Sequence, residues 1–265
     1  MEDIKLVAID LDGTLLSDNR KISVPTVKMI KKLAQKDIKI ILASARTPNS
    51  ILPYYQELDL KTPMICLSGA YIGFSESQAI DKRPLSLHSY KKLIEILENE
   101  DLYLKVYGLN RLYVKEKSEA TAKFSKNFNV PFEVMERTSL ANVDREPFRI
   151  FLLHLTAALR DRYLQWIPSH FADFNVTREG DDGIEIVDAF ASKGIALKKV
   201  CEMYAIDLKN VMAIGNERND LSMLKESGTS IAMGNACDEL KQIADTVTKD
   251  NENDGVAWIL NQYFS

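Results

Sequence analysis

The stretch VAIDLDGTLL, residues 7–16, sets an apolar run against two aspartates that are separated by one leucine. The apolar half is typical of a buried β-strand, and Asp10 and Asp12 then follow at its carboxyl end. Two carboxylates this close repel each other and resist burial, so a strand end with a purely structural role would gain little from them. The stretch therefore predicts that a cation or a reacting group belongs beside these two residues.

The composition is that of an ordinary globular protein. The chain has 265 residues, of which 46% are hydrophobic, so it can bury a sizeable core in one large domain or two modest ones. Its 34 basic residues nearly balance 38 acidic ones, and the formal charge of -4 comes without a long block of one sign. We therefore expect neither a nucleic acid nor a membrane surface as a partner.

Two further features bear on the compartment. Cys66, Cys201 and Cys237 lie far apart and form no CxxC pair, which argues against a disulfide framework and a structural zinc site. The opening residues are acidic, without the basic segment of a signal peptide, and no apolar run approaches the roughly 20 residues of a membrane span. We expect reduced thiols and a cytoplasmic protein without a membrane segment.

The first and last thirds of the chain alternate apolar, branched segments with segments of helical spacing. In the first third the pattern predicts strands at 5–10, 38–45 and 63–67 and helices at 23–36 and 47–58. Pro53 should limit or bend the second of these helices. In the last third the pattern predicts helices at 193–205, 219–227, 237–244 and 255–264 and strands at 210–215, 229–234 and 245–248. Such alternation favours one parallel α/β sheet built from both ends of the chain.

The middle of the chain has a different pattern. Its segments predict strands at 103–108, 111–115, 148–155 and 173–179, interleaved with helices at 86–100, 118–128 and 156–167. We expect an inserted α+β domain at about 82–186, with residues 1–81 and 187–265 forming the α/β core.

Distinctive polar residues follow the predicted core strands. In open α/β sheets, ligands bind where the loops at the carboxyl ends of the strands converge. Such ends carry Asp10 and Asp12, Ser44 and Arg46, Ser68, and the segment GNERND at 215–220. Lys193 begins a helix near the same edge, where its charge opposes the helix dipole, which favours a functional role for it.

Five blocks of sequence in this order resemble the haloacid dehalogenase superfamily of phosphatases, in its Cof-type branch. They are DLDGTLL (10–16), ASAR (43–46), SKG (192–194), GNERND (215–220) and AMGNACDELKQIADTVTKDNENDGVA (232–257). The resemblance implies a Rossmann-like core with a large cap domain inserted after the third strand. It also implies hydrolysis of small phosphate monoesters, such as a sugar phosphate, through a phospho-aspartate with Mg²⁺.

The resemblance gives each aspartate of the opening stretch a role. Asp10 would be the nucleophile and a Mg²⁺ ligand, which splits one hard hydrolysis into two easier steps. Asp12 would protonate the leaving oxygen and then activate water, while its backbone carbonyl binds the metal. Cations are needed there, because each pair of like charges at about 4 Å repels by roughly 4 kcal/mol at an effective dielectric near 20.

The resemblance also implies how the phosphate is held. The backbone amides of Leu11 and Ala45 would donate to it, together with the hydroxyl of Ser44. Lys193 would neutralise its charge, so that Ser44 and Lys193 join the two aspartates as catalytic residues. Asn219 would reach the phosphate or orient a neighbour.

The chain departs from the family at one metal ligand. The usual GDxxND motif becomes Gly215-Asn216-Glu217-Arg218-Asn219-Asp220, so a neutral amide replaces a carboxylate. An amide oxygen can coordinate Mg²⁺ with a smaller electrostatic gain. We expect weaker metal affinity with the site geometry kept, or recruitment of Asp220 closer to the metal. An engineered substitution or a natural loss of activity is also open. A milder departure is Ser68, where NGA is common in the family and this chain has SGA.

Two other functions remain open at this point. A phosphosugar mutase or phosphotransferase would use the same nucleophile but pass the phosphoryl group to a second sugar. A non-catalytic sensor of a phosphorylated metabolite is the interpretation that Asn216 motivates.

The remaining polar residues have simpler interpretations. Glu185 and Asp188 lie where the chain returns to the core, and we expect an acid that ends an exposed strand. His88, His154 and His170 have no spacing typical of a metal site, so we expect none of them to be catalytic.

Overall fold

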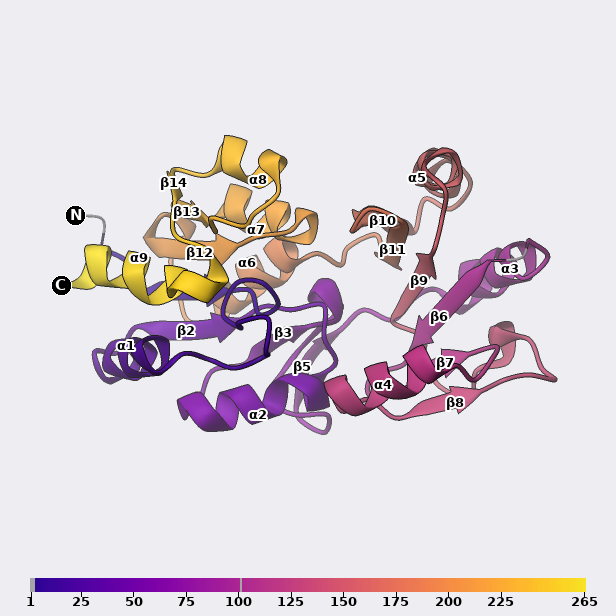
Figure 1. The fold of residues 1–265 in the computed structure, drawn as a ribbon, viewed down its shortest axis with the longest axis horizontal. Coiled ribbons are helices and arrows are strands. Elements are labelled where there is room, and N and C mark those ends of the chain that lie inside the picture. Colours follow the sequence, from indigo (N-terminus) through magenta and orange to yellow (C-terminus); the bar gives the residue numbers. More distant parts are fainter. Residues whose placement is uncertain (1–2, 101) are drawn as a thin grey trace.

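The protein has two parts, each built on its own sheet, and we call them the core and the cap (Figure 1). The computed structural model describes residues 3–100 and 102–265. Both chain ends lie on the core, at the side away from the cap (Figure 1). The α/β architecture with an additional cap sheet confirms the predicted fold class.

The core sheet is parallel throughout and has the strand order β14-β13-β12-β1-β2. Its strands are β1 (Leu6–Ile9), β2 (Lys39–Leu42), β12 (Val211–Gly215), β13 (Thr229–Ala232) and β14 (Thr246–Val247). Every residue of β1 is buried, as an apolar strand covered on both faces requires.

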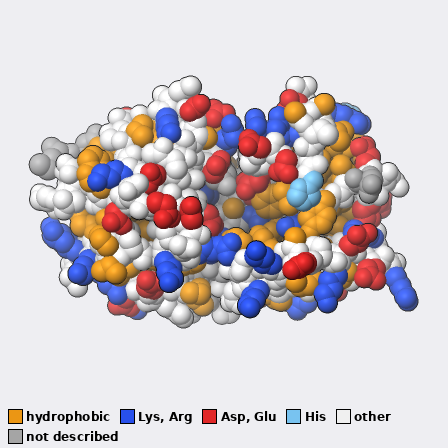
Figure 2. Space-filling view, in the orientation of Figure 1, with side chains coloured by type: hydrophobic (Ala, Val, Ile, Leu, Met, Phe, Trp, Pro, Cys, Tyr) orange, Lys and Arg blue, Asp and Glu red, His pale blue; other side chains and the backbone are white. Residues whose placement is uncertain are grey.

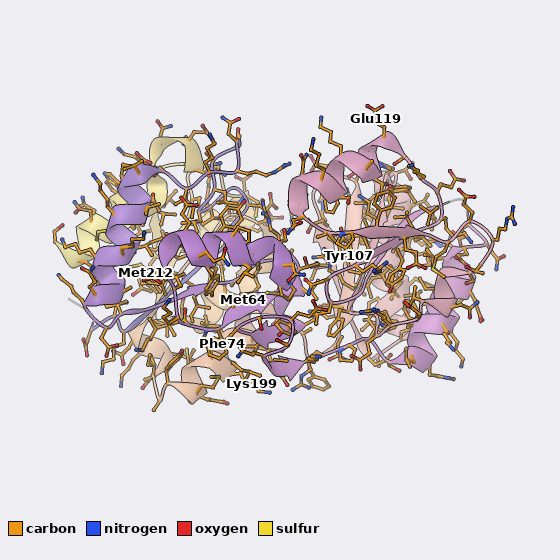
Figure 3. All side chains as sticks on the ribbon, turned by 90° about the horizontal axis from the view of Figure 1, so that it is seen from below. Met64, Phe74, Tyr107, Glu119, Lys199 and Met212 are labelled. Atoms are coloured by element: carbon orange, nitrogen blue, oxygen red, sulfur yellow. The ribbon has the colours of Figure 1, made fainter. Side chains whose placement is uncertain are left out.

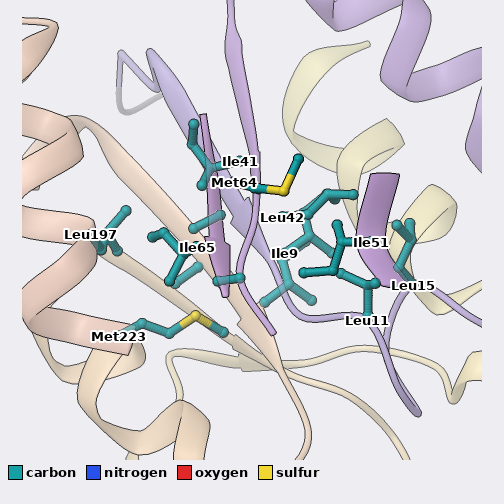
Figure 4. Packing of buried hydrophobic residues seen from close by; sticks show 14 of the residues in the cluster. Ile9, Leu11, Leu15, Ile41, Leu42, Ile51, Met64, Ile65, Leu197 and Met223 are labelled. Carbon is teal, nitrogen blue, oxygen red and sulfur yellow. The ribbon is translucent and has the colours of Figure 1, made fainter. Parts of the chain in front are cut away.

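Helices cover both faces of this sheet. They are α1 (Val24–Gln35), α2 (Pro48–Leu58), α6 (Lys193–Met203), α7 (Leu221–Glu226), α8 (Asp238–Ile243) and α9 (Gly255–Phe264). Short 3₁₀ turns lie at η1 (Leu67–Gly69), η3 (Leu208–Asn210), η4 (Arg218–Asp220) and η5 (Asn251–Asn253). Figure 4 shows the neighbours Ile41 and Leu42 pointing to opposite faces, the first toward Leu197 and the second toward Ile51. Helix α2 continues through Pro53 to Leu58, so this proline does not end it.

The third predicted strand is more irregular than the sequence suggested. Strand β3 (Met64–Cys66) is joined to the core sheet through one parallel bridge between Ala43 and Ile65. Its remaining pairing is antiparallel, to a hairpin of β4 (Tyr71–Gly73) and β5 (Ala79–Lys82) that we had not expected.

In the described residues, the cap is a mixed sheet with three helices of 10 to 14 residues. Its strand order is β10-β11-β9-β6-β7-β8. The elements are α3 (Leu87–Leu97), β6 (Tyr103–Tyr107), β7 (Leu112–Val114), α4 (Glu119–Phe128), β8 (Phe132–Val134), η2 (Leu140–Asn142), β9 (Arg149–Leu153), α5 (Ala157–His170), β10 (Phe174–Glu179) and β11 (Gly183–Asp188). Strands β8 and β11 were not expected. Domain boundaries at 82 and 186 stay predictions, and the second falls inside β11.

The two faces of the cap sheet differ in character because successive strand residues point to opposite sides. One face packs against α3 and α5 with the aliphatic residues Leu104, Val106, Ile150, Leu152, Ile184 and Ile186. The pairings Lys105 with Phe151 and Phe151 with Glu185 place these three residues on the other face. That second face is turned toward the core, while Figure 1 shows α3 and α5 on the far side of the cap.

The structure bears on two of the sequence predictions, the reduced thiols and the lack of a membrane segment, but it does not show the compartment. Cys66, Cys201 and Cys237 are free, and the first two are buried. In the part of the chain that the structure describes, none of the helices has the length and apolar character needed to cross a bilayer.

Candidate active site

The site lies where the strand order of the core sheet reverses. Strand β1 is flanked by β2, which follows it in the chain, and by β12, which comes far later. Ligands of open α/β folds bind in the crevice at such a switch point, beyond the carboxyl ends of the strands. Asp10 follows β1 and Asn216 follows β12, so the sheet brings them to this crevice.

Lys193 links two buried carboxylates at this point. Its Nζ lies 2.6 Å from Asp10 Oδ1 and 2.6 Å from Asp220 Oδ1, and all three residues are buried. Helix α6 sets this geometry, because it begins at Lys193 and is capped by the Ser192 hydroxyl, which accepts from the backbone N–H of Ile195 at 3.1 Å. We call these three charged residues the core network.

Burial and the close charges shift the pKa values of Asp10 and Lys193 in the core network. Burial and the nearby carboxylate of Asp220 raise the pKa of Asp10, although Lys193 opposes the shift. Burial alone would lower the pKa of Lys193, but the two carboxylates raise it, so the ammonium stays charged. When both carboxylates are ionised, two negative charges share one ammonium, and the raised pKa of Asp10 reflects this excess.

Asp12 points away from the core network and is held by Arg46. The guanidinium donates from Nε to Asp12 Oδ2 at 2.8 Å and from Nη2 to Asp12 Oδ1 at 2.5 Å. The Arg46 side chain is only 5% exposed, whereas that of Asp12 is 49% exposed. Asp12 is thus positioned at the edge of the crevice, where a leaving group or a water molecule can reach it.

The residues around Asn216 form a set of oxygen donors. One end of its side-chain amide lies 3.2 Å from Asp10 Oδ2 and 3.0 Å from the carbonyl oxygen of Asp12. Neighbouring ligands of an octahedral Mg²⁺ with bonds of 2.0–2.1 Å lie about 2.9 Å apart. The three groups therefore fit Mg²⁺ in chemistry and in spacing, with the amide oxygen as the third ligand.

The Thr14 hydroxyl donates to Asn216 Oδ1 at 2.9 Å. With its amide turned over, Asn216 would instead donate from its nitrogen to Asp10 Oδ2, to the Asp12 carbonyl and to Thr14 Oγ1. Within the described residues, no three histidine, cysteine, aspartate or glutamate side chains cluster as a metal site. The oxygen donors around Asn216 form no such cluster, because one of them is an amide and another a backbone carbonyl.

Gly13 makes the turn beneath this donor set. Its φ is +76°, which glycine adopts without cost, and a Cβ there would lie 2.5 Å from the Asn216 amide. The backbone of this loop therefore approaches residue 216 as closely as it can.

The predicted phosphate-binding groups lie beside Asp10. Among the described residues, the backbone N–H groups of Leu11 and Ala45 donate to no other group. Ser44 is buried, and its hydroxyl accepts from the backbone N–H of Arg46 at 3.1 Å, so its own hydrogen is left to donate. This arrangement suits an anion.

Asp220 and Asn219 take different positions. Asp220 is fully buried, and its Oδ2 accepts from the backbone N–H groups of Asn216 at 2.9 Å and Glu217 at 3.0 Å. It supports Lys193 and the loop after β12. Asn219 has no side-chain hydrogen bond to the described residues and lines a separate cavity of about 370 Å³ with Ser68 and Ser192. Its predicted contact with the phosphate or with a neighbouring residue stays a prediction.

A second buried network joins the cap to the core, and sequence reasoning missed it. Arg149 of β9 lies 3.3 Å from Glu185 Oε1 and donates to the backbone carbonyl of Ala45. Glu185 Oε1 also accepts from the Ser68 hydroxyl at 2.7 Å. We call these four residues the cap network.

The expectation that Glu185 ends an exposed strand was wrong. Its side chain is 1% exposed, because β11 continues to Asp188 and turns this residue toward the core. An arginine inside the apolar run FRIFLLHL at 148–155 was the available signal, since a buried arginine needs a buried acid.

Comparison with known proteins agrees with this geometry. Residues 7–260 match the family model described as haloacid dehalogenase-like hydrolase. The chain is 29% identical to the 5-amino-6-(5-phospho-D-ribitylamino)uracil phosphatase YitU of Bacillus subtilis, over 98% of this chain and 97% of that one. It is 28% identical to the pyridoxal phosphate phosphatase YbhA of Escherichia coli, over 96% of each chain.

The fold is shared with solved structures of the same kind. A haloacid dehalogenase-like hydrolase from Bacillus subtilis superposes with a TM-score of 0.88 at 24% identity, covering 97% of this chain and 99% of that one. The family model spans the core and the cap together, and the relatives align from end to end. The chain therefore belongs to the haloacid dehalogenase-like hydrolases, in their Cof-type branch, and is a phosphatase.

Proposed function

We propose that this phosphatase hydrolyses small phosphate monoesters through a phosphoryl group carried on Asp10, with Mg²⁺ held by Asp10, the Asp12 carbonyl and Asn216. The observation that carries the proposal is the core network, in which one buried ammonium lies 2.6 Å from each of two buried carboxylates. A purely structural pair would not keep an extra carboxylate at a topological switch point.

In the first step, a carboxylate oxygen of Asp10 attacks phosphorus and the ester P–O bond breaks. Asp12 gives its proton to the leaving alcohol oxygen. Lys193 balances the charge that gathers on Asp10 and the phosphoryl oxygens, and the free N–H groups of Leu11 and Ala45 donate to those oxygens.

In the second step, Asp12 takes a proton from water, and the oxygen of that water attacks phosphorus. The bond to Asp10 breaks, which returns the carboxylate and releases inorganic phosphate. When bound, Mg²⁺ supplies neutralisation of the phosphoryl charge and fixes the line of attack.

Arg46 constrains the timing of these steps. Both carboxyl oxygens of Asp12 accept from Arg46, so this pair must open before Asp12 can turn toward a leaving group. The phosphate of an incoming substrate is an alternative partner for the guanidinium, and that exchange would free Asp12.

The substrate is a small phosphorylated metabolite, because the cap closes over the crevice and restricts access. A sugar phosphate or a related metabolite is the class that we proposed from the sequence. The two named relatives act on a phosphorylated uracil derivative and on pyridoxal phosphate, which supports phosphate esters of small molecules. The free cysteines agree with the reducing cytoplasm, which we propose as the compartment.

The acceptor of the phosphoryl group separates hydrolysis from the alternative phosphosugar mutase or phosphotransferase. Release of inorganic phosphate at the rate of substrate loss supports hydrolysis, whereas formation of an isomer without phosphate release supports a mutase. The phosphatase relatives favour an enzyme over the metabolite sensor that Asn216 suggested.

The test is phosphate release from p-nitrophenyl phosphate and a panel of phosphorylated metabolites with Mg²⁺. We expect Asp10→Asn to lower the rate by at least about 10³-fold, because it removes the nucleophile. Asp37→Asn is the matched control, since Asp37 is exposed and pairs with Lys39 on the surface.

Asp12→Asn gives a second, independent readout. Because this variant lacks the base of the second step, acid quenching should trap a phosphoryl group on the peptide that contains Asp10, detected by mass spectrometry. An active Asp10→Asn protein, or a phosphorylated peptide that lacks Asp10, would overturn the assignment.

A further inference from the structure

Residues 232–257, the longest of the five sequence blocks, contribute no group to the proposed chemistry. They run from the end of β13 through α8 and β14 into α9, all of which lie on the core in Figure 1. Figure 2 shows the surface hollowed between the core and the cap. In Figure 3, Met212 of β12, the strand beside β13, lies in the core, and Tyr107 lies in the cap. None of the described residues of this block lines the cavity of about 350 Å³ between the two parts.

The block instead holds the loop after β1, which carries Asp12, at two points. The side-chain amide of Asn235 donates to the carbonyl oxygen of Gly13 at 2.8 Å. The side-chain amide of Asn251 donates to the carbonyl oxygen of Leu16 at 3.1 Å. The first of these contacts lies directly beside the proposed metal donors.

The peptide unit between Gly13 and Thr14 is fixed at both of its polar ends. The backbone N–H of Thr14 donates to the carbonyl oxygen of Leu11 at 3.2 Å, and the Gly13 carbonyl accepts from Asn235. Within the described chain, the Gly13 carbonyl has no other hydrogen-bond partner. Gly13 has a φ of +76° and no side chain, so the residue itself restrains its dihedral angles little. Asn235 therefore restrains the neighbouring Asp12 carbonyl, which is one of the proposed Mg²⁺ donors.

The same segment after β13 also holds the loop that carries Asn216. The backbone N–H of Cys237 donates to the carbonyl oxygen of Asn216 at 2.9 Å, and that of Met233 donates to the carbonyl oxygen of Gly215 at 3.0 Å. The proposed donors come from loops that follow two different strands. Because residues 233–237 contact both loops, the spacing between the donors depends on this segment.

The neutral ligand at position 216 makes this spacing more important. An amide oxygen attracts a cation less strongly than a carboxylate does, so less of the binding free energy comes from charge. Mg²⁺ also demands nearly ideal octahedral geometry. A donor that is already held in place costs no ordering when the cation binds, and this saving appears as affinity.

We propose that Asn235 is a positioning residue for the Mg²⁺ site, which it serves by holding the Gly13 peptide so that the Asp12 carbonyl faces Asn216. Asn235 acts through the backbone and supplies no ligand of its own. This inference rests on the proposed function, because it takes the Asp12 carbonyl and Asn216 as metal donors.

The test measures cation binding directly, in the absence of substrate. Mn²⁺ shares the preference of Mg²⁺ for oxygen ligands, and electron paramagnetic resonance measures its free concentration during a titration. We expect Asn235→Ala to raise the dissociation constant for Mn²⁺ about fivefold, the equivalent of one hydrogen bond. Asn235→Leu keeps the size of the side chain but removes its donor, and it should weaken binding equally.

Asn253→Ala is the matched control. Asn253 and Asn235 are exposed residues of the same block, and each donates from its amide at 2.8 Å, but Asn253 donates to Asp250. This control should keep the affinity of the wild type for Mn²⁺. In EDTA, Asn235→Ala and Asn253→Ala should melt at similar temperatures, because each loses the hydrogen bonding of one exposed amide.

The dependence of activity on Mg²⁺ gives a second signature. Phosphate release by Asn235→Ala should fall furthest below that of the wild type at low Mg²⁺. The difference should shrink as Mg²⁺ approaches saturation, because the bound cation then orders the loop. A rate that is lowered by the same factor at every Mg²⁺ concentration would indicate a general structural defect and overturn the positioning role.

Failure of this inference differs from failure of the proposed function. If the wild type binds Mn²⁺ and Asn235→Leu binds it equally well, the positioning role alone is overturned. If the wild type binds no Mn²⁺ and its activity does not depend on Mg²⁺, the proposed function loses its metal site, and the positioning role fails with it.

Discussion

The core network and the cap network are both buried, yet they are built for different purposes. In the core network, Lys193 faces Asp10 and Asp220, so two carboxylates share one ammonium. In the cap network, Arg149 faces the single carboxylate of Glu185, and the charges balance. A buried negative excess needs a further cation or a bound proton, whereas a balanced pair needs neither. The ratio of carboxylates to cations therefore distinguishes the proposed reactive site from a contact that holds the cap against the core.

The two networks also differ in what they connect. Every member of the core network belongs to the α/β core, at the carboxyl ends of β1 and β12 or at the start of α6. The cap network spans the two parts, because Arg149 donates to the carbonyl of Ala45 and Glu185 accepts from Ser68. It therefore holds the cap against the loop that is predicted to bind phosphate.

The largest effect should come from removing the shared ammonium. Lys193→Met leaves two carboxylates buried without a cation, and we expect it to lower the free energy of unfolding by about 3–5 kcal/mol. Phosphatase activity should fall by at least about 10³-fold, since the charge opposed to the phosphoryl group is lost. Urea denaturation and phosphate release measure the two effects.

The matched control for this variant lies on the same helix. Lys198→Met removes an ammonium that is 44% exposed and pairs with Glu226 at 2.7 Å, and it should cost about 0.5 kcal/mol or less. If both lysine variants behaved alike, the core network would have no special role in stability or catalysis.

The cap network should show a smaller loss with a different signature. Arg149→Met leaves the carboxylate of Glu185 buried and unpaired, and we expect it to cost about 3 kcal/mol of stability. Adding Glu185→Gln should restore part of that loss, because the stranded charge is then removed. A double-mutant cycle in urea measures this coupling, with the exposed Arg145→Met as control.

Kinetics should separate the two networks further. Arg149 contacts Ala45 but not Asp10, so Arg149→Met should raise KM more than it lowers kcat. If Arg149→Met lowered kcat as much as Lys193→Met does, the cap network would not act only by holding the cap against the core.

Sequence reasoning reached the fold and the family through residues close to one another in the chain. The run at 7–16 predicts β1 and its acidic end, and the family model that covers residues 7–260 confirms the resemblance. The roles of Asp10, Asp12 and Lys193 stay predictions, although the structure places them in one crevice. The alternation of strands and helices predicted the parallel sheet because buried parallel strands are apolar along their whole length.

Other features could not be predicted, for physical reasons. The cap network joins positions 45, 68, 149 and 185, and no local pattern shows that separate segments meet. The hairpin β4–β5 was missed because its strands are short, and β5 is largely exposed, so it lacks an apolar repeat. The direction of the Asn219 side chain depends on the 3₁₀ turn η4, which motif spacing does not specify.

Asn216→Asp sharpens the comparison, because it adds a third carboxylate to a site that already has a negative excess. The amide of Asn216 can turn its nitrogen toward Asp10 and the Asp12 carbonyl, whereas a carboxylate at this position would repel both. We expect the variant to lose about 1–3 kcal/mol of stability in EDTA, from the lost hydrogen bonds and the like charge. Thermal unfolding in EDTA measures this loss.

With enough Mg²⁺, we expect Asn216→Asp to have a higher melting temperature than the wild type, the reverse of the order in EDTA. A charged ligand binds the cation more tightly, so the melting temperature of Asn216→Asp should rise more steeply with Mg²⁺ than that of the wild type. Equal melting temperatures at every Mg²⁺ concentration, together with equal rates, would show that residue 216 is not a ligand.

The smallest effect concerns Glu179, which lines the cavity of about 350 Å³ between the cap and the core and belongs to neither network. Burial and the negative charge of Glu185 raise the pKa of Glu179 to about 7, although Arg149 and Lys193 oppose the shift and Glu217 adds to it. The folded state thus binds a proton more tightly than the unfolded chain does. The resulting stability is complete below the usual pKa of glutamate, near 4.5, and is lost as the pH rises to about 7.

Glu179→Gln removes this pH dependence, so the variant should be more stable than the wild type at pH 8 and equal to it near pH 4.5. The expected gain at pH 8 is about 1–2 kcal/mol, less than the full conversion of the shift because the side chain is not completely buried. Urea denaturation across this pH range measures it, with Glu95→Gln as the exposed control. If Glu179→Gln raised the free energy of unfolding equally at every pH, lost repulsion from Glu185 would not be the cause. The carboxylate of Glu179 would then be solvated in the folded protein.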